Sequence, residues 1–362
     1  MNINYKNFYR DKNLMKELNE RIWDEENVNF NLMEVCGTHT RAIFTNGIDR
    51  LIPPGINLIS GPGCPVCVTS REYIDSAITL SIQGCIIVTF GDMIRVPGYK
   101  ASLEEQRAAG GDIRIVYSPL DCIKIAIDNP KKEVVFLGVG FETTSPSIAL
   151  MVIRSKEMKI NNLSVLLSLK RMVPVMDHLL ADEDMIIDGF ICPGHVSSII
   201  GYEEFNKLSV QYRKPMVVVG FDPVDIMGGI LTLINMINNN EYICKNNYCR
   251  VVKSKGNVQA TEVINSVFKV SHSFWRGIGK VLNSGFEFNY EYEIYDAEKK
   301  FNLMIRNKDD KCECFCGEII KGKCKPEECP YFGQGCTPSH PIGPCMVSME
   351  GTCNIVYSLG GF

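Results

Sequence analysis

The chain has 362 residues, of which 45% are hydrophobic and 22% are charged, as in globular proteins that bury a sizeable core. This length exceeds what one hydrophobic core usually organises, so two or three domains are expected. A formal net charge of −4 gives no reason to expect a nucleic-acid partner.

The cysteine content indicates the compartment and the chemistry. The first residues are polar and lack the apolar core of a secretory signal, and no apolar run is long enough to span a bilayer. Sixteen cysteines in such a chain are more often metal-binding or redox-active than joined as disulfides. We therefore expect a cytoplasmic protein with no membrane partner.

Short apolar runs alternate with amphipathic stretches through most of the chain. The predicted strands are Leu32–Val35, Ile56–Ser60, Cys85–Phe90, Ile113–Tyr117, Val134–Val139, Ser164–Leu169, Asp188–Cys192 and Met216–Gly220. The predicted helices are Ser70–Ile82, Leu103–Ala109, Leu120–Asp128, Ser147–Met158 and Asp225–Ile237, followed by a helical stretch from about Ala260 to Asn283.

This alternation predicts an α/β fold whose sheets are mostly parallel and flanked by helices. Short echoes such as Gly-Phe-acid after two different strands favour two related lobes. We expect lobe I over residues 31–132 and lobe II over residues 133–258. Residues 1–30 and 259–362 should form a mixed helical and irregular module that carries the cysteine-rich tail.

The first predicted strand runs into the motif CGTHT, which begins at Cys36. In open α/β sheets reactive groups collect at the carboxyl ends of strands. A cysteine at the N-terminus of a helix meets free amide donors, which lower its pKa and favour the thiolate. His39 follows three residues later and could accept the thiol proton, although a buried structural cysteine is the simpler alternative.

The second predicted strand leads into GPGCPVC, which contains Cys64 and Cys67. A Cys-x-x-Cys pair brings two sulfurs close enough to form a disulfide or to share a metal ion. The motif resembles a thiol–disulfide pair at the start of a helix. Half of a zinc site is the competing interpretation.

Three further strand ends carry polar groups. They are Glu142 in GFETT, the Asp92 and Arg95 pair in TFGDMIRVPG, and His195 in PGHVS. Each is a weak signal alone, because a turn histidine or a capping acid is common. Together they could line one cleft suited to a polar, anionic ligand.

Eight of the sixteen cysteines lie between Cys312 and Cys353. Glycines and prolines between them predict loops, which can bend several thiolates around one inorganic centre. All-thiolate coordination suits an iron–sulfur cluster or zinc. The set predicted to bind is Cys314, Cys329, Cys336 and Cys353, with spacing C-x14-C-x6-C-x16-C. The neighbouring cysteines that compete for these roles are Cys312, Cys316, Cys324 and Cys345.

The six motifs CGTHT, GPGCPVC, TFGDMIRVPG, GFETT, PGHVS and the spaced tail cysteines occur in one order over most of the chain. In this the sequence closely resembles the HypD family of hydrogenase maturation factors. The resemblance implies assembly of the Fe(CN)2CO group of [NiFe]-hydrogenases. It also implies a [4Fe-4S] cluster on the four spaced tail cysteines.

The same resemblance implies partners and site roles. A small HypC-type chaperone would share the transient iron of the Fe(CN)2CO group with Cys36, and a HypE-type protein would deliver cyanide from a thiocyanate. The hydrogenase large subunit would receive the product. We expect a scaffold with a redox role, with no conventional turnover of a small molecule.

Cleaving a thiocyanate to release cyanide requires two electrons. The Cys64/Cys67 dithiol can store two, whereas a [4Fe-4S] cluster relays one at a time. We therefore expect a relay from an external donor through the cluster to this pair and on to Cys36. His39, Glu142 and His195 would handle protons or hydrogen-bond the cyanide nitrogens.

Two other functions compete with this interpretation. A cluster-dependent thiol–disulfide reductase acting on a protein client would not depend on Cys36. A zinc-stabilised ligand-binding protein would be colourless.

Overall fold

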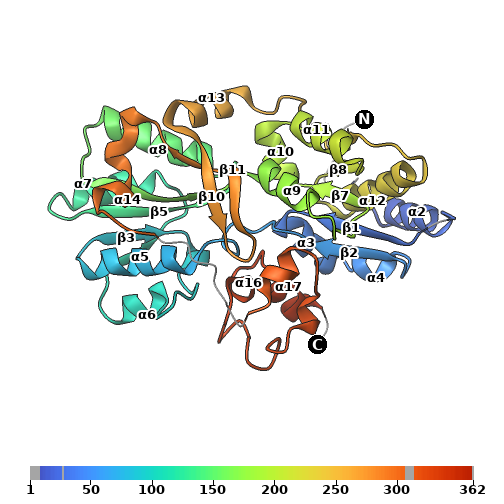
Figure 1. Ribbon diagram of the computed structural model, residues 1–362, viewed down its shortest axis with the longest axis horizontal. Coiled ribbons are helices and arrows are strands. Elements are labelled where there is room, and N and C mark those ends of the chain that lie inside the picture. Colours follow the sequence, from blue (N-terminus) through green and yellow to red (C-terminus); the bar gives the residue numbers. More distant parts are fainter. Residues whose placement is uncertain (1–8, 27, 306–313, 361–362) are drawn as a thin grey trace.

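The computed structural model describes residues 9–26, 28–305 and 314–360. Two parallel sheets lie side by side, flanked by helices, and an antiparallel ribbon and a small helical tail complete the molecule (Figure 1). The predicted α/β class with parallel sheets is confirmed. No helix in the described part of the chain is long and apolar enough to cross a membrane.

The larger sheet has the strand order β2-β1-β7-β8-β9. Its strands are β1 (Phe30–Glu34), β2 (Ile56–Ser60), β7 (Gly189–Cys192), β8 (Met216–Val218) and β9 (Cys244–Asn246). Its helices are α2 (Lys12–Trp23), α3 (Gly37–Thr45), α4 (Ile48–Leu51), α9 (Met172–Leu180), α10 (Gly194–Ile200), α11 (Glu203–Tyr212) and α12 (Pro223–Asn238).

Alternate residues of these strands enter two cores. Leu32 packs in the core that contains buried residues of α2, α3 and α12, whereas its neighbour Met33 packs on the opposite face with residues of α9 and α11. Because both faces are covered, the strands read as nearly continuous apolar runs, as expected of a parallel sheet.

The smaller sheet has the strand order β4-β3-β5-β6. Its strands are β3 (Ile86–Thr89), β4 (Ile113–Ile115), β5 (Val134–Gly140) and β6 (Leu163–Leu169). Its helices are α5 (Arg71–Ile82), the 3-10 turn η1 (Gly91–Met93), α6 (Leu103–Ala108), α7 (Asp121–Asp128) and α8 (Ser145–Glu157). α5 contributes to the core on one face, and α7 and α8 contribute to the core on the other.

The sheets divide the chain differently from the expected lobes 31–132 and 133–258. The chain leaves the larger sheet after β2, builds the whole smaller sheet over residues 86–169, and returns to the larger sheet at β7. There β1 pairs with β7, for example Leu32 with Gly189. Parallel strands need long crossover connections, so their order in the sequence does not reveal which strands pair.

The helix expected as far as Asn283 is wrong beyond α13 (Val258–Val267). The chain instead forms the antiparallel ribbon of β10 (Phe268–Trp275) and β11 (Gly279–Phe288). Gly277 and Gly279 have φ of 80° and 106°, a left-handed backbone that reverses the chain at no steric cost. Buried Trp275 fixes the turn, because its Nε1 donates to Ser284 Oγ at 2.8 Å.

The tail is a mixture of short helices and loops, as expected. Its elements are η2 (Tyr290–Tyr295), α14 (Ala297–Lys300), α15 (Cys316–Ile320), η3 (Pro326–Glu328), α16 (Pro344–Val347) and α17 (Thr352–Leu359). In Figure 1 the cysteine-rich part lies below the junction of the two sheets, beside α3. Cys312, one of the competing ligands, lies outside the described residues.

Candidate metal centre

Cys36 lies at the carboxyl end of β1 and at the start of a helix, as the sequence predicted, and is itself the N-cap residue of α3. It faces a cleft of about 140 Å³. The lining residues are Val35, Cys36, Thr38, Gly63, Pro65, Phe141, Thr143, Thr144, Met172, Pro193, His195, Val196 and Glu350. Strand ends of both sheets and the tail therefore meet around this one thiol.

The protonation of Cys36 differs from the expectation. Burial, followed by the nearby carboxylate of Glu350, raises the pKa of the Cys36 thiol to about 12. Hydrogen bonds from the amides of α3 act in the opposite direction but are the smaller effect. The uncomplexed thiol is therefore protonated at neutral pH, and a bound cation would have to displace its proton.

Two carboxyl groups that the sequence analysis did not select lie beside Cys36. Glu34 Oε2 accepts a hydrogen bond from the Cys36 backbone N–H at 3.0 Å, and burial raises the pKa of Glu34 to about 8. Glu350 reaches the cleft from the tail and accepts a hydrogen bond from Thr38 Oγ1 at 2.6 Å. Glu34 could have been suspected as an acid in an otherwise apolar strand, but no local pattern marks Glu350.

The two predicted histidines lie on either side of Phe221. The rings of His39 and Phe221 stack at 4.5 Å between centroids, and those of His195 and Phe221 stack at 3.9 Å. His195 lines the cleft, whereas fully buried His39 lies behind it and bonds through Nε2 to the Gly220 carbonyl at 3.0 Å. Burial lowers the pKa of His39 to about 4, so it is a poor acceptor for the thiol proton.

Phe221 contacts Tyr248, whose ring is in turn held by an arginine–aspartate ion pair. Tyr248 contacts the edge of the Phe221 ring at 6.1 Å between centroids, and the Arg250 guanidinium lies 4.5 Å from the Tyr248 ring centroid. Arg250 in turn makes two hydrogen bonds to buried Asp225, at 2.7 and 2.5 Å. This bidentate pair fixes the aromatic group and therefore the orientation of both imidazoles.

Glu142 is buried at the end of β5 but does not line the cleft, although its neighbours Phe141 and Thr143 do. Its Oε1 accepts a hydrogen bond from the backbone N–H of Met172 at 2.9 Å, at the start of α9. Burial raises its pKa to about 7. Its expected role with protons or cyanide stays a prediction.

The Cys64–Cys67 loop packs directly against Cys36. The Gly37 backbone N–H donates to the Gly63 carbonyl at 3.2 Å, and a Cβ on Gly63 would lie within 2.7 Å of three backbone atoms of Cys36. Both thiols are buried, and the Cys67 backbone N–H donates to Cys64 Sγ at 3.2 Å. The pair thus lies behind the cleft wall.

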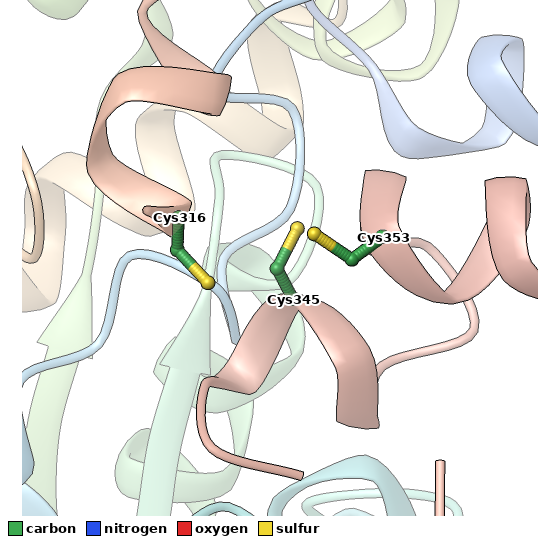
Figure 2. Close-up of side chains that lie close together, drawn as sticks. All are labelled: Cys316, Cys345 and Cys353. Carbon is green, nitrogen blue, oxygen red and sulfur yellow. The ribbon is translucent and has the colours of Figure 1, made fainter. Parts of the chain in front are cut away.

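Cys345 connects this pair to the tail. It is buried and hydrogen-bonds to Cys316, Cys353 and Cys67, and these bonds, that to Cys316 having the largest effect, lower its pKa well below the usual value for a thiol. Cys316, Cys345 and Cys353 bring their sulfurs within 4.8 Å of one another from α15, α16 and α17 (Figure 2). Thiol contacts therefore run without interruption from Cys67 to the tail.

The described tail cysteines fit an all-thiolate metal site. Cys353, one of the predicted ligands, belongs to the close group, and predicted Cys314 lies 2.7 Å from Cys316, sulfur to sulfur. The absent side chain of Gly343 leaves room for both sulfurs, because a Cβ there would lie 2.5 Å from each. Soft, buried thiolates of this kind suit an iron–sulfur cluster. Which cysteines bind it stays a prediction.

The sequence of this chain matches a known protein family. The family model described as "HypD: Hydrogenase formation hypA family" matches residues 11–360. The chain belongs to the HypD family. It is 43% identical over 336 residues to the hydrogenase maturation factor HypD of Rhodobacter capsulatus, covering 91% of this chain and 89% of that protein. The Escherichia coli (strain K12) HypD is 41% identical, with 90% and 88% covered, and that of Rhizobium leguminosarum bv. viciae is 39% identical, with 99% and 96% covered.

Membership of the HypD family establishes the general function of this chain as hydrogenase maturation. Other maturation proteins are therefore its partners. The cysteine group of the tail could hold a metal in the same molecule.

Proposed function

We propose that this HypD-family chain is the scaffold on which the Fe(CN)2CO group of [NiFe]-hydrogenase is assembled, with Cys36 as its iron ligand. The observation that carries the proposal is the position of Cys36, in a cleft formed by strand ends of both sheets and backed by the Cys64–Cys67 loop. A HypC-type chaperone would share the iron, a HypE-type partner would bring cyanide, and the hydrogenase large subunit would receive the product.

The residues around Cys36 suit loading of an iron cation. Iron binds the thiolate, so the proton of a thiol whose pKa is about 12 must leave when the metal arrives. Glu34 and Glu350 are the nearby acids whose charges act on that thiol. The negative charge of Glu350 opposes ionisation of the free thiol but attracts a cation, and Glu34, whose pKa burial raises to about 8, adds its charge once its own proton leaves. Both acids therefore favour the loaded state over the empty one.

The thiol pair supplies the electrons of the cyanide step. A partner thiocyanate R–S–CN and the Cys64/Cys67 dithiol would give R–SH, cyanide, one proton and the Cys64–Cys67 disulfide. The S–CN bond takes up two electrons, and the same two electrons leave the dithiol as its S–S bond forms. His195 lines the cleft at the place where a hydrogen-bond partner for cyanide is needed.

Cys345 is placed to restore the dithiol, because it hydrogen-bonds to Cys67 on one side and to the tail group on the other. A [4Fe-4S] cluster held by tail thiolates, predicted as Cys314, Cys329, Cys336 and Cys353, would supply single electrons there. The thiol contacts give those electrons a buried route to the pair.

A thiol–disulfide reductase acting on a protein client is the second candidate. The same series of thiol contacts from the tail to Cys67 favours it. The cleft around Cys36 opposes it, because a reductase of this kind would not depend on that thiol, whereas strand ends of both sheets gather around it. Reduction of a generic protein disulfide that persists in Cys36→Ala would support this alternative.

The proposed electron route through Cys345 and Cys67 is tested by replacing these thiols in cells that mature a [NiFe]-hydrogenase. We expect Cys67→Ser and Cys345→Ser to abolish maturation, whereas Cys249→Ser, at an exposed cysteine, serves as the matched control and should leave it intact. Alkylation gel shifts should show two thiols gained on reduction in the wild type and none in Cys67→Ser. Normal maturation by both Cys67→Ser and Cys345→Ser would overturn the thiol route.

A further inference from the structure

A buried lysine lies outside the metal centre. Lys170 follows β6, is 4% exposed, and its Nζ donates to Ser273 Oγ of β10 at 2.7 Å. It faces a cavity of about 600 Å³ between β6, the β10–β11 ribbon and α14, a volume in the range of small-molecule sites. The cavity shares no lining residue with the cleft around Cys36.

The charge of Lys170 is not balanced by the described part of the chain. No carboxylate there forms an ion pair with its ammonium, and burial alone lowers its pKa to about 7. A buried ammonium normally has a charged partner, because desolvation without one is costly. With a single serine hydroxyl bonded, two of its three N–H donors remain for a ligand.

Two of the three acidic side chains of the cavity wall have other partners, and the third, Glu298, is exposed to solvent and forms no ion pair with Lys170. Glu287 pairs with Lys269 at 3.0 Å and accepts a hydrogen bond from Ser271 Oγ at 3.3 Å. Asp296 caps α14 by accepting from the backbone N–H groups of Glu298 and Lys299, at 2.9 and 3.3 Å. These carboxylates therefore do not supply the missing counter-charge.

The other side chains of the cavity wall indicate which kind of anion would fit. Ser168, Ser271 and Ser273 add hydroxyl groups to the cavity wall, Ser273 directly at the ammonium, whereas Phe274 and Phe286 are among its apolar residues. Hydroxyl groups and a cation suit a carboxylate, and the apolar surface suits a short hydrocarbon chain. An inorganic anion would leave that apolar surface unused.

We propose that this cavity is a second ligand site, which binds a small organic carboxylate through the Lys170 ammonium and the Ser273 hydroxyl. The charge-assisted hydrogen bond to Lys170 provides the selectivity for an anion, and the aromatic side chains contact its hydrocarbon part. The site does not depend on iron at Cys36.

Calorimetric titration of the full chain with three ligands of four carbons each tests the proposal: butyrate, n-butanol and n-butylammonium. Butyrate should bind saturably and the other two should not. Lys170→Met should weaken butyrate binding about tenfold or more, because a hydrogen bond to a charged group is lost. Lys280→Met removes an exposed lysine of the same ribbon and should leave the affinity unchanged. Equal butyrate affinity of Lys170→Met and wild type would overturn the proposal.

A measurement on the wild type keeps the proposal testable if Lys170→Met does not fold. Lysines are acylated with an N-hydroxysuccinimide ester, and the modified peptides are quantified by mass spectrometry. Butyrate should slow modification of Lys170 but not of Lys280, and butanol should protect neither. Unchanged modification of Lys170 at saturating butyrate would refute binding at this site.

Discussion

Replacement of Gly63 by Ala tests the contact between the Cys64–Cys67 loop and Cys36. A methyl group there would lie within 2.7 Å of the backbone N, Cα and C of Cys36. Ordinary contacts with a Cβ begin at 3.4 Å. No side-chain rotation can relieve the overlap, because all three atoms are backbone, so the two loops must separate by roughly 1 Å.

Two magnitudes follow from this separation. Forcing an extra methyl group into a close-packed interior costs about 1–3 kcal/mol of unfolding free energy. A displacement of about 1 Å between reacting groups lowers rates by about 10²-fold. Gly63→Ala should therefore lower the Tm moderately and reduce hydrogenase maturation far more than the loss of folded protein explains.

The matched control is Gly228→Ala on α12, where an added Cβ meets nothing within 4 Å. Alanine is favoured over glycine in a helix by about 1 kcal/mol, so this variant should be slightly more stable and mature hydrogenase normally. Both variants are compared by thermal unfolding and by hydrogenase activity in cells that lack their own HypD-family protein. A Gly63→Ala variant with wild-type Tm and wild-type maturation would refute the close contact.

Three further predictions concern the tail, the Arg250–Asp225 pair behind Phe221 and the buried lysine. Cys336→Ala should lower the iron content and brown colour of anaerobic protein, and unchanged iron would remove it from the predicted ligand set. Arg250→Met should lower the unfolding free energy measured in urea by about 1–3 kcal/mol, because it leaves the buried Asp225 carboxylate without its cation. It should also reduce maturation. The pKa of Lys170 falls from 10.5 to about 7 on folding, so unfolding free energy should decrease as pH falls between these values and stay level below. Lys170→Met should remove this slope, and an unchanged slope would contradict the burial of its charge.

Local pattern was sufficient to predict eight of the nine strands described in the two parallel sheets, whereas the three-residue strand β9 was missed. All eight predicted strands occur, with ends shifted by at most two residues. Their burial on both faces produces apolar runs that are easily recognised. The pairing of β1 with β7 was not predictable, because it depends on contacts between segments far apart in the sequence. The β10–β11 ribbon was missed because its turn depends on two glycines in a left-handed conformation.

The candidate site was predictable where it follows the rule that parallel strands end at one edge. Cys36 and His195 both reach the cleft for this reason. The raised pKa of Cys36 was not predictable, since it depends on burial and on Glu350, which arrives from the tail. The role of Cys345 as the contact between Cys67 and the tail group also needed the packed structure, because sequence spacing alone left several cysteines equivalent.

In the proposed function, Cys36 holds the iron on which the Fe(CN)2CO group is built. Anaerobic complexes of this chain with HypC-type and HypE-type partners should be compared by infrared spectroscopy and iron analysis, as wild type and as Cys36→Ala. The wild-type complex should show cyanide and carbonyl stretching bands, and Cys36→Ala should lose these bands while keeping its tail iron. Cyanide and carbonyl bands of full intensity in Cys36→Ala would show that the iron is anchored elsewhere.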